Sequence, residues 1–119
     1  MGDLYLVGSG VSKSFSEAAK WYRLAADKGN QWAQFGLGVL HHNGQGVPQS
    51  YKEAAKWYRL SADQGNSDAQ FYLGVLYEHG AGVPASSAEA IKYYKLAAAQ
   101  GNLQAAQNLK NVVLDGLRR

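Results

Sequence analysis

The 119-residue sequence contains no cysteine, two prolines and a single methionine. The absence of cysteine excludes disulfide bonds, thiolate zinc sites and cysteine nucleophiles, and it is compatible with a reducing, cytoplasmic compartment. No apolar run is long enough to cross a bilayer, and the start Met1-Gly2-Asp3 has neither the basic nor the apolar region of a signal peptide. We therefore expect one domain and no membrane partner.

Signatures of catalysis are also missing. No H-E-x-x-H, P-loop, G-x-S-x-G or S-x-x-K motif occurs in the chain. The histidines are poor candidates for a metal site, because the adjacent His41 and His42 point about 100° apart on a helix and only His79 remains. The Gly-x-Gly pairs follow no strand pattern and lack the lysine of a phosphate-binding loop. We therefore expect no enzyme, metal or cofactor.

The chain is instead rich in internal repetition. One pentapeptide recurs at a constant spacing of 36 residues, as Ala18–Tyr22, Ala54–Tyr58 and Ala90–Tyr94. A period of this length is typical of a solenoid, in which each unit buries its apolar face only against its neighbours. The sequence therefore predicts an all-α array of stacked helix-turn-helix repeats.

Helix boundaries are marked in the same register. A Ser-x-x-Glu capping box starts at Ser14, Ser50 and Ser86, and a Gly-Asn pair that ends one helix and starts the next follows each pentapeptide. These signals predict first helices over 14–28, 50–64 and 86–100. Second helices are predicted over 31–43, 67–79 and 103–117, the first two ending at a Gly-x-Gly-Val-Pro loop.

Two glycines, Gly38 and Gly74, lie inside the second helices at equivalent positions. Each costs about 1 kcal/mol relative to alanine in a helix interior. We interpret this cost as the consequence of a neighbouring helix that passes close to the glycine backbone.

The central unit resembles the Sel-one-like repeat, a relative of the tetratricopeptide repeat. The resemblance is carried by Glu53–Tyr58, Ala62–Asn66, Ala69-Gln70, Leu73-Gly74, Tyr77 and Gly80–Val83, and it covers nearly the whole chain. It implies a right-handed α-solenoid whose first helices line a concave surface and whose role is protein binding, as a scaffold or adaptor. The family often has aspartate where the capping serines stand, and its secreted members often carry a cysteine pair per repeat.

We divide the single repeat domain, residues 1–119, into a partial repeat over 1–13 and three repeats over 14–49, 50–85 and 86–119. Leu4–Val11 aligns with Leu40–Val47, so the partial repeat is part of a second helix, belonging either to a longer array or to a diverged half repeat. Its open edge at Leu4, Tyr5 and Leu6 predicts weak self-association. Gln107, Asn108 and Lys110 replace Phe71, Tyr72 and Gly74, as expected of a C-terminal capping repeat.

The net charge of +3 is small, but the cationic residues recur at two fixed repeat positions on the first helices, beside an aligned row of aromatic residues. Stacking places these residues in parallel rows on or beside the expected concave face. Ladders of aromatic residues are more often packing than binding, and the row of Trp21 and Trp57 is expected to be more open than the tyrosine row. The candidate partner-binding residues are Lys20, Trp21, Arg23, Lys56, Trp57, Arg59, Lys92 and Lys95.

Three readings of the cationic rows remain open. They form a solvated face held by i,i+3 and i,i+4 ion pairs with neighbouring acids, a groove for an acidic or carboxylate-bearing peptide, or a nucleic-acid or anionic-membrane surface. We favour a non-catalytic protein-interaction module that binds a peptide or a partner protein. The alternatives are a hydrolase-like activity, as ascribed to cysteine-rich relatives, and nucleic-acid binding through the rows.

Overall fold

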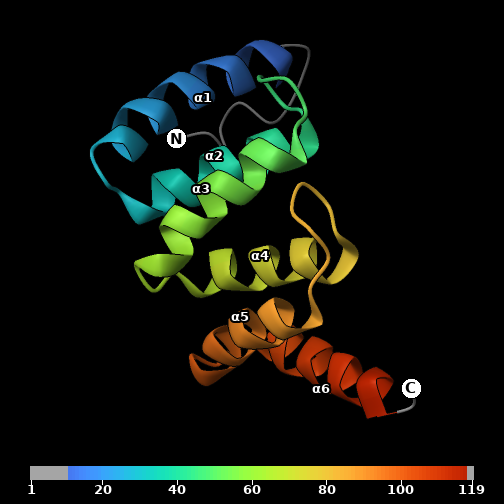
Figure 1. Cartoon of the computed structure of the whole chain (residues 1–119). Coiled ribbons are helices and arrows are strands. Elements are labelled where there is room, and N and C mark those ends of the chain that lie inside the picture. Colours follow the sequence, from blue (N-terminus) through green and yellow to red (C-terminus); the bar gives the residue numbers. More distant parts are fainter. Residues whose placement is uncertain (1–10, 118–119) are drawn as a thin grey trace.

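The structure, a computed structural model that describes residues 11–117, consists of six α-helices joined by short turns, with no strand in that part of the chain (Figure 1). The helices are α1 Val11–Asp27, α2 Gln31–Asn43, α3 Tyr51–Asp63, α4 Ser67–His79, α5 Ser87–Ala99 and α6 Leu103–Leu117. Each packs mainly against the helices before and after it, and the molecule extends over 48 × 23 × 23 Å. The predicted all-α array is confirmed. The expected edge at Leu4, Tyr5 and Leu6 lies outside the described residues.

Serine caps begin the first helices of the second and third repeats. The amide of Glu53 donates to Ser50 Oγ, and that of Glu89 donates to Ser86 Oγ, each at 3.1 Å. This confirms the two caps and places the helix starts within one residue of their predicted positions. Asn30 and Asn66 cap α2 and α4 in the same way, each accepting from an amide at 2.9 Å.

The cap predicted at Ser14 is wrong, because α1 begins at Val11 and Ser14 lies inside the helix. The difference follows from one residue of the preceding loop. Pro48 and Pro84 stand two residues before the capping serines of α3 and α5, where they disfavour helix in the residue before them. The equivalent position before Ser14 is Ser12, which permits helix, so α1 extends to Val11.

Successive repeats meet where a tyrosine ring lies on a glycine. A Cβ atom added to Gly38 would lie 2.6 Å from Tyr58 Cδ1, and one added to Gly74 would lie 2.7 Å from Tyr94 Cδ1. Real Cβ atoms do not approach other atoms so closely, so only glycine fits either position. The predicted close crossing is therefore confirmed, between α2 and α3 and again between α4 and α5.

The two interfacial tyrosines are buried but keep polar partners. The Tyr94 hydroxyl donates to Glu78 Oε1 at 2.6 Å, and the Tyr58 hydroxyl lies 3.3 Å from His42 Nδ1. Burial raises the pKa of both hydroxyls well above the ordinary tyrosine value, and burial also lowers the pKa of His42. Tyr58, Tyr94 and His42 are consequently uncharged at neutral pH.

A ladder of glutamine amides joins the same repeats near the other ends of the helices. The buried Gln34 amide donates to the Ala26 carbonyl at 3.2 Å and accepts from Gln64 Nε2 at 2.7 Å. Gln70 repeats this arrangement one unit later, with Gln100 as its donor at 3.0 Å. A buried amide that is satisfied on both sides stabilises the interface and fixes its register.

The outer face of α6 is mixed rather than uniformly polar. Leu103 and Leu117 are 83% and 79% exposed, and Val113 is also exposed. Lys110 is exposed at the position that Gly38 and Gly74 occupy in the earlier repeats. The glycine on which a tyrosine ring rests in the earlier repeats is therefore absent from α6.

Substitution of glycine by alanine tests the crossing. We expect Gly74→Ala to lower the free energy of unfolding by about 1–3 kcal/mol, because the new methyl group displaces the Tyr94 ring. Gly116→Ala in α6 is the matched control, since nothing lies within 4 Å of its added Cβ, and it should be neutral or stabilising by up to about 1 kcal/mol. Urea denaturation measures both. Equal effects of the two substitutions would contradict the proposed contact.

The serine caps provide a second comparison. Ser50→Ala should lower the free energy of unfolding by about 1 kcal/mol, because the Glu53 amide loses its partner. Ser14→Ala should change it by less than about 0.5 kcal/mol, because Ser14 lies within α1. Thermal melts followed by circular dichroism will separate the two. A loss at Ser14 as large as that at Ser50 would show that Ser14 has a capping role after all.

Candidate functional site

The two cationic rows lie on α1, α3 and α5, as expected. Lys20, Lys56 and Lys92 are exposed members of one row. The second row consists of Arg23 and Lys95, which are exposed, and Arg59, which is half-buried. Five of these six side chains are therefore accessible to a partner.

The aromatic row beside them is open only at Trp21. Trp21 is 68% exposed, whereas Trp57 and Tyr93 are 4% and 2% exposed. Trp57 belongs to one buried cluster with Ala19 and Ala26 of the preceding first helix. Trp21 has no preceding first helix among the described residues. Trp57, one of the candidate partner-binding residues, is therefore part of the core and not of the open surface.

Cationic side chains cover the buried indole of Trp57. The guanidinium carbon of Arg23 lies 5.3 Å from its ring centre, and Lys56 Nζ lies 5.2 Å from the same ring. These distances are typical of cation–π contacts. The Trp57 Nε1 atom is buried and has no hydrogen-bond partner among the described residues, so the ring is held by packing and by these cations alone.

The next repeat contains a related arrangement. Arg59 donates to the Tyr77 hydroxyl, and its guanidinium carbon lies 5.5 Å from the centre of the Tyr77 ring. Tyr77 is stacked on Tyr93, with ring centres 6.0 Å apart, and Lys92 Nζ lies 5.0 Å from the Tyr93 ring. Burial lowers the pKa of Arg59, but the hydrogen bond to Tyr77 and nearby charges raise it by more. The recurrence of the cationic positions thus has a packing cause.

Local ion pairs neutralise little of this surface. Among residues whose side chains are described, the salt bridge observed joins Arg23 to Asp27 at 3.3 Å between two exposed side chains. The anticipated pairs of Lys20, Lys56 and Lys92 with the glutamates three residues earlier do not form there, nor does the pair of Arg59 with Asp63. The lysine ammonium groups remain available to an acidic partner.

A row of exposed leucines, missed in the sequence, lies beside the lysines. Leu24, Leu60 and Leu96 are 57%, 43% and 44% exposed. Each stands four residues after a lysine of the first row, and therefore on the same side of its helix. The sequence could have predicted this row, because the three leucines occupy the same repeat position and lie on a different side of the helix from the core alanines. We call the lysine and leucine rows together the Lys–Leu surface.

The cationic side chains are concentrated on the first helices of the repeats. Each first helix carries one more cationic than acidic side chain, whereas α4 carries two acidic residues and no lysine or arginine. The positive potential therefore follows the first helices along the array. Such alignment raises the local potential above what the net charge of the chain suggests.

The described part of the chain contains no grouping of three or more histidine and acidic residues suited to a metal ion. None of its helices is long and apolar enough to span a membrane.

Comparison with protein families decides the relationship. A family model described as Sel1 repeat matches three segments of the chain, residues 1–30, 33–66 and 67–102. The chain belongs to the Sel1 repeat family. Sel1 repeat proteins generally serve as protein-interaction modules, and the fold is generally a non-catalytic scaffold. Comparison with curated protein sequences gives no significant match.

Solved structures of Sel1 repeat proteins show the same right-handed α-solenoid. A protective antigen of uropathogenic Escherichia coli with an SLR fold is 38% identical, with a TM-score of 0.87 over 97% of this chain and 25% of its own. A Sel1 repeat protein from Oxalobacter formigenes is 36% identical, with a TM-score of 0.80 over 94% of this chain and 46% of its own. The present chain thus spans a quarter to a half of these relatives.

Cysteine-rich protein B of Helicobacter pylori shares the fold at a TM-score of 0.73 and 23% identity, over 76% of this chain and 68% of its own. The cysteines in that protein's name have no counterpart in the present Sel1 repeats.

Two members of the second cationic row, Arg59 and Lys95, have different environments, which substitution can compare. Arg59→Ala should lower the free energy of unfolding by about 1 kcal/mol, because Arg59 binds both the hydroxyl and the ring of Tyr77. Lys95→Ala, at the equivalent exposed position, should change it by less than about 0.5 kcal/mol. Chemical denaturation of both variants measures the difference. A neutral Arg59→Ala would mean that this residue is free for partner binding.

Proposed function

We propose that these Sel1 repeats form a non-catalytic protein-binding module whose Lys–Leu surface docks an acidic partner segment along the first helices. The observation that carries the proposal is the alignment of Lys20, Lys56 and Lys92, exposed and without ion pairs to their own glutamates. Electrostatic complementarity of this kind mainly accelerates encounter and selects the partner.

The leucine row supplies the apolar part of the interaction. Leu24, Leu60 and Leu96 are each about half exposed, next to a lysine on the same helix face. Burying such side chains against a partner stabilises the complex by roughly 1 kcal/mol or more each. The chemistry therefore fits a segment in which acidic and apolar side chains alternate, with the exposed Trp21 as a further contact at one end.

Nucleic-acid binding fits this surface less well. Recognition of single strands requires exposed aromatic rings on which bases stack. In the aromatic row, Trp57 and Tyr93 are buried beneath cationic side chains, and only Trp21 is open. The cationic residues are also the same in each repeat, so they offer no means of reading a sequence.

A fluorescein-labelled peptide that alternates glutamate with leucine is a suitable probe. The triple variant Lys20→Glu, Lys56→Glu and Lys92→Glu should bind it on the order of tenfold more weakly or worse in fluorescence anisotropy. It should keep its helicity, because these lysines are exposed and the variant removes only the cation–π contacts of Lys56 and Lys92 from the fold. Circular dichroism of the variant checks this before binding is compared. Arg59 is left unchanged because it also stabilises the fold.

The control is Lys28→Glu, Gln107→Glu and Lys110→Glu, which makes a nearly equal change in net charge at exposed positions outside the Lys–Leu surface. It should retain most of the binding at moderate salt, where charges beyond about 10 Å are screened. An equal loss of peptide affinity in the two triple variants would show that only the overall charge matters, and it would contradict binding at the Lys–Leu surface. Tighter binding of a single-stranded RNA than of the peptide would favour the alternative function.

A further inference from the structure

The arginines of the first and second repeats are used differently. Arg59 donates to the Tyr77 hydroxyl, and its guanidinium lies over the Tyr77 ring of the same repeat. The equivalent of Tyr77 in the first repeat is His41, which has no hydroxyl group. Arg23, the counterpart of Arg59, lies over the ring of Trp57 in the next repeat instead. Arg23 is therefore exposed, whereas Arg59 is half-buried and bound to its own repeat.

Three hydrogen-bond donors are brought together at Trp57. The guanidinium carbon of Arg23 and Lys56 Nζ lie 5.3 and 5.2 Å from the centre of its ring. Within the part of the chain that the structure describes, Trp57 Nε1 is the buried side-chain nitrogen that has no hydrogen-bond partner. We call these three residues the Arg23–Lys56–Trp57 cluster. Two of its donor groups are charged and one is an unsatisfied N–H.

Asp27 is a weak partner for this cluster. Arg23 Nε lies 3.3 Å from Asp27 Oδ1, and the two side chains are 58% and 57% exposed. Exposed ion pairs contribute little to stability, because water screens them and the two side chains lose conformational freedom. The pair is formed through Nε, so the two Nη groups of the guanidinium lie outside it. A second carboxylate can therefore bind to Arg23.

A carboxylate from a partner has the chemistry that the cluster lacks. A buried N–H group without an acceptor raises the free energy of the folded chain. A carboxylate accepts several hydrogen bonds at once, and those from charged donors are the stronger ones. One acidic group can therefore bind both cations and also satisfy the indole N–H.

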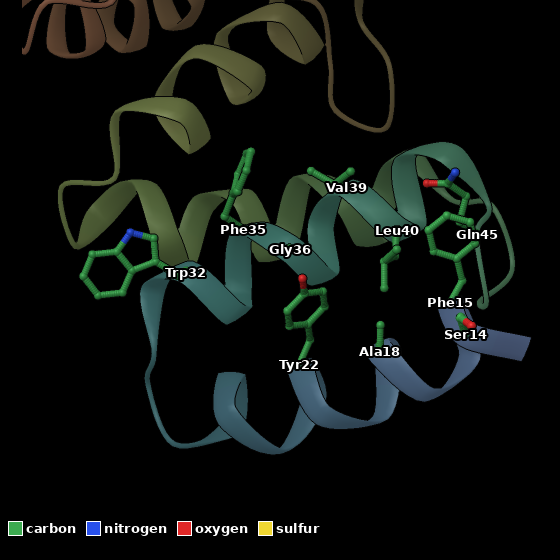
Figure 2. Close-up of a pocket in the computed structure, with 10 residues that line it drawn as sticks. All are labelled: Ser14, Phe15, Ala18, Tyr22, Trp32, Phe35, Gly36, Val39, Leu40 and Gln45. Atoms are coloured by element: carbon green, nitrogen blue, oxygen red, sulfur yellow. The ribbon is translucent and has the colours of Figure 1, made fainter. Parts of the chain in front are cut away.

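The hollow between α1 and α2 offers no alternative position for an acidic group. This cavity of about 390 Å³ is lined on α1 by Phe15, Ala18 and Tyr22, whose side chains point toward α2 in Figure 2. None of the described residues that line it is charged. A carboxylate placed there would lose hydration without gaining a cation.

We propose that the Arg23–Lys56–Trp57 cluster is the subsite that binds a glutamate or aspartate side chain of the acidic partner. The proposal rests on the function proposed above and makes the junction of the first two repeats its main anchor. The carboxylate accepts from Lys56 and Arg23, which move from the indole ring onto it, and from the Trp57 N–H that they cover. The exposed Leu60, four residues after Lys56, contacts an apolar side chain beside the acid.

The repeats supply a matched pair of variants, Lys56→Gln and Lys92→Gln. Each removes one exposed lysine, whose Nζ lies 5.2 Å from the Trp57 ring or 5.0 Å from the Tyr93 ring. Lys56→Gln should weaken binding of the glutamate–leucine peptide at least several-fold more than Lys92→Gln does in fluorescence anisotropy. Equal losses would overturn the subsite but leave the Lys–Leu surface as the binding site. A parent chain that does not bind the peptide would overturn both proposals.

The indole N–H of Trp57 reports directly on its new acceptor. Trp21 and Trp32 are 68% and 69% exposed, so Trp21→Phe and Trp32→Phe identify their indole resonances, and the remaining one belongs to Trp57. In ¹⁵N-labelled chain, the glutamate–leucine peptide should move the Trp57 indole proton downfield by more than those of Trp21 and Trp32. A glutamine–leucine peptide should not move it. An unmoved Trp57 resonance in the saturated complex, or an equal shift with the glutamine peptide, would overturn the proposal.

Discussion

The contact of a tyrosine ring with a glycine backbone is the constraint on which the array depends. The second and third repeats each present a tyrosine from the first helix to the glycine of the preceding second helix, with no room for a single additional carbon atom. This contact fixes how closely and at what height successive units stack. The positions of the lysine, leucine and aromatic rows follow from it, because residues on the first helices align only if every unit is stacked alike.

Most of the fold could be predicted from the sequence because the same local signals occur in each copy. The second helices match their predicted ranges, and the glycine crossings were predictable from the cost of glycine within a helix. The start of α1 does not follow from the capping box at Ser14 alone, because the residues before Ser14 determine whether the helix begins there. A serine can cap a helix only if the residues before it are not helical. Pro48 keeps the residues before Ser50 out of the helix, whereas Ser12 does not do so before Ser14.

The candidate site was only partly predictable. The positions of the cationic rows follow from the repeat spacing. The burial of Trp57 could not be predicted in this way, because it depends on side chains of the preceding repeat and not on the periodicity of its own helix. Trp21 has the same local sequence and remains exposed. The leucine row is not expected from residue type, because leucine is normally a core residue. In this protein alanines and tyrosines make up most of the core.

The glycine–tyrosine contact also explains how such an array can change its length by duplication. The segment of residues 50–85 carries Tyr58 toward one neighbour and Gly74 toward the other, so each unit is complementary to a copy of itself. An in-frame duplication of this segment would bring a second Tyr58 onto Gly74 and a second Gly74 onto Tyr94, and no other residue at the crossing would need to change. The length of the binding surface can therefore evolve in whole units, independently of the residues that select a partner.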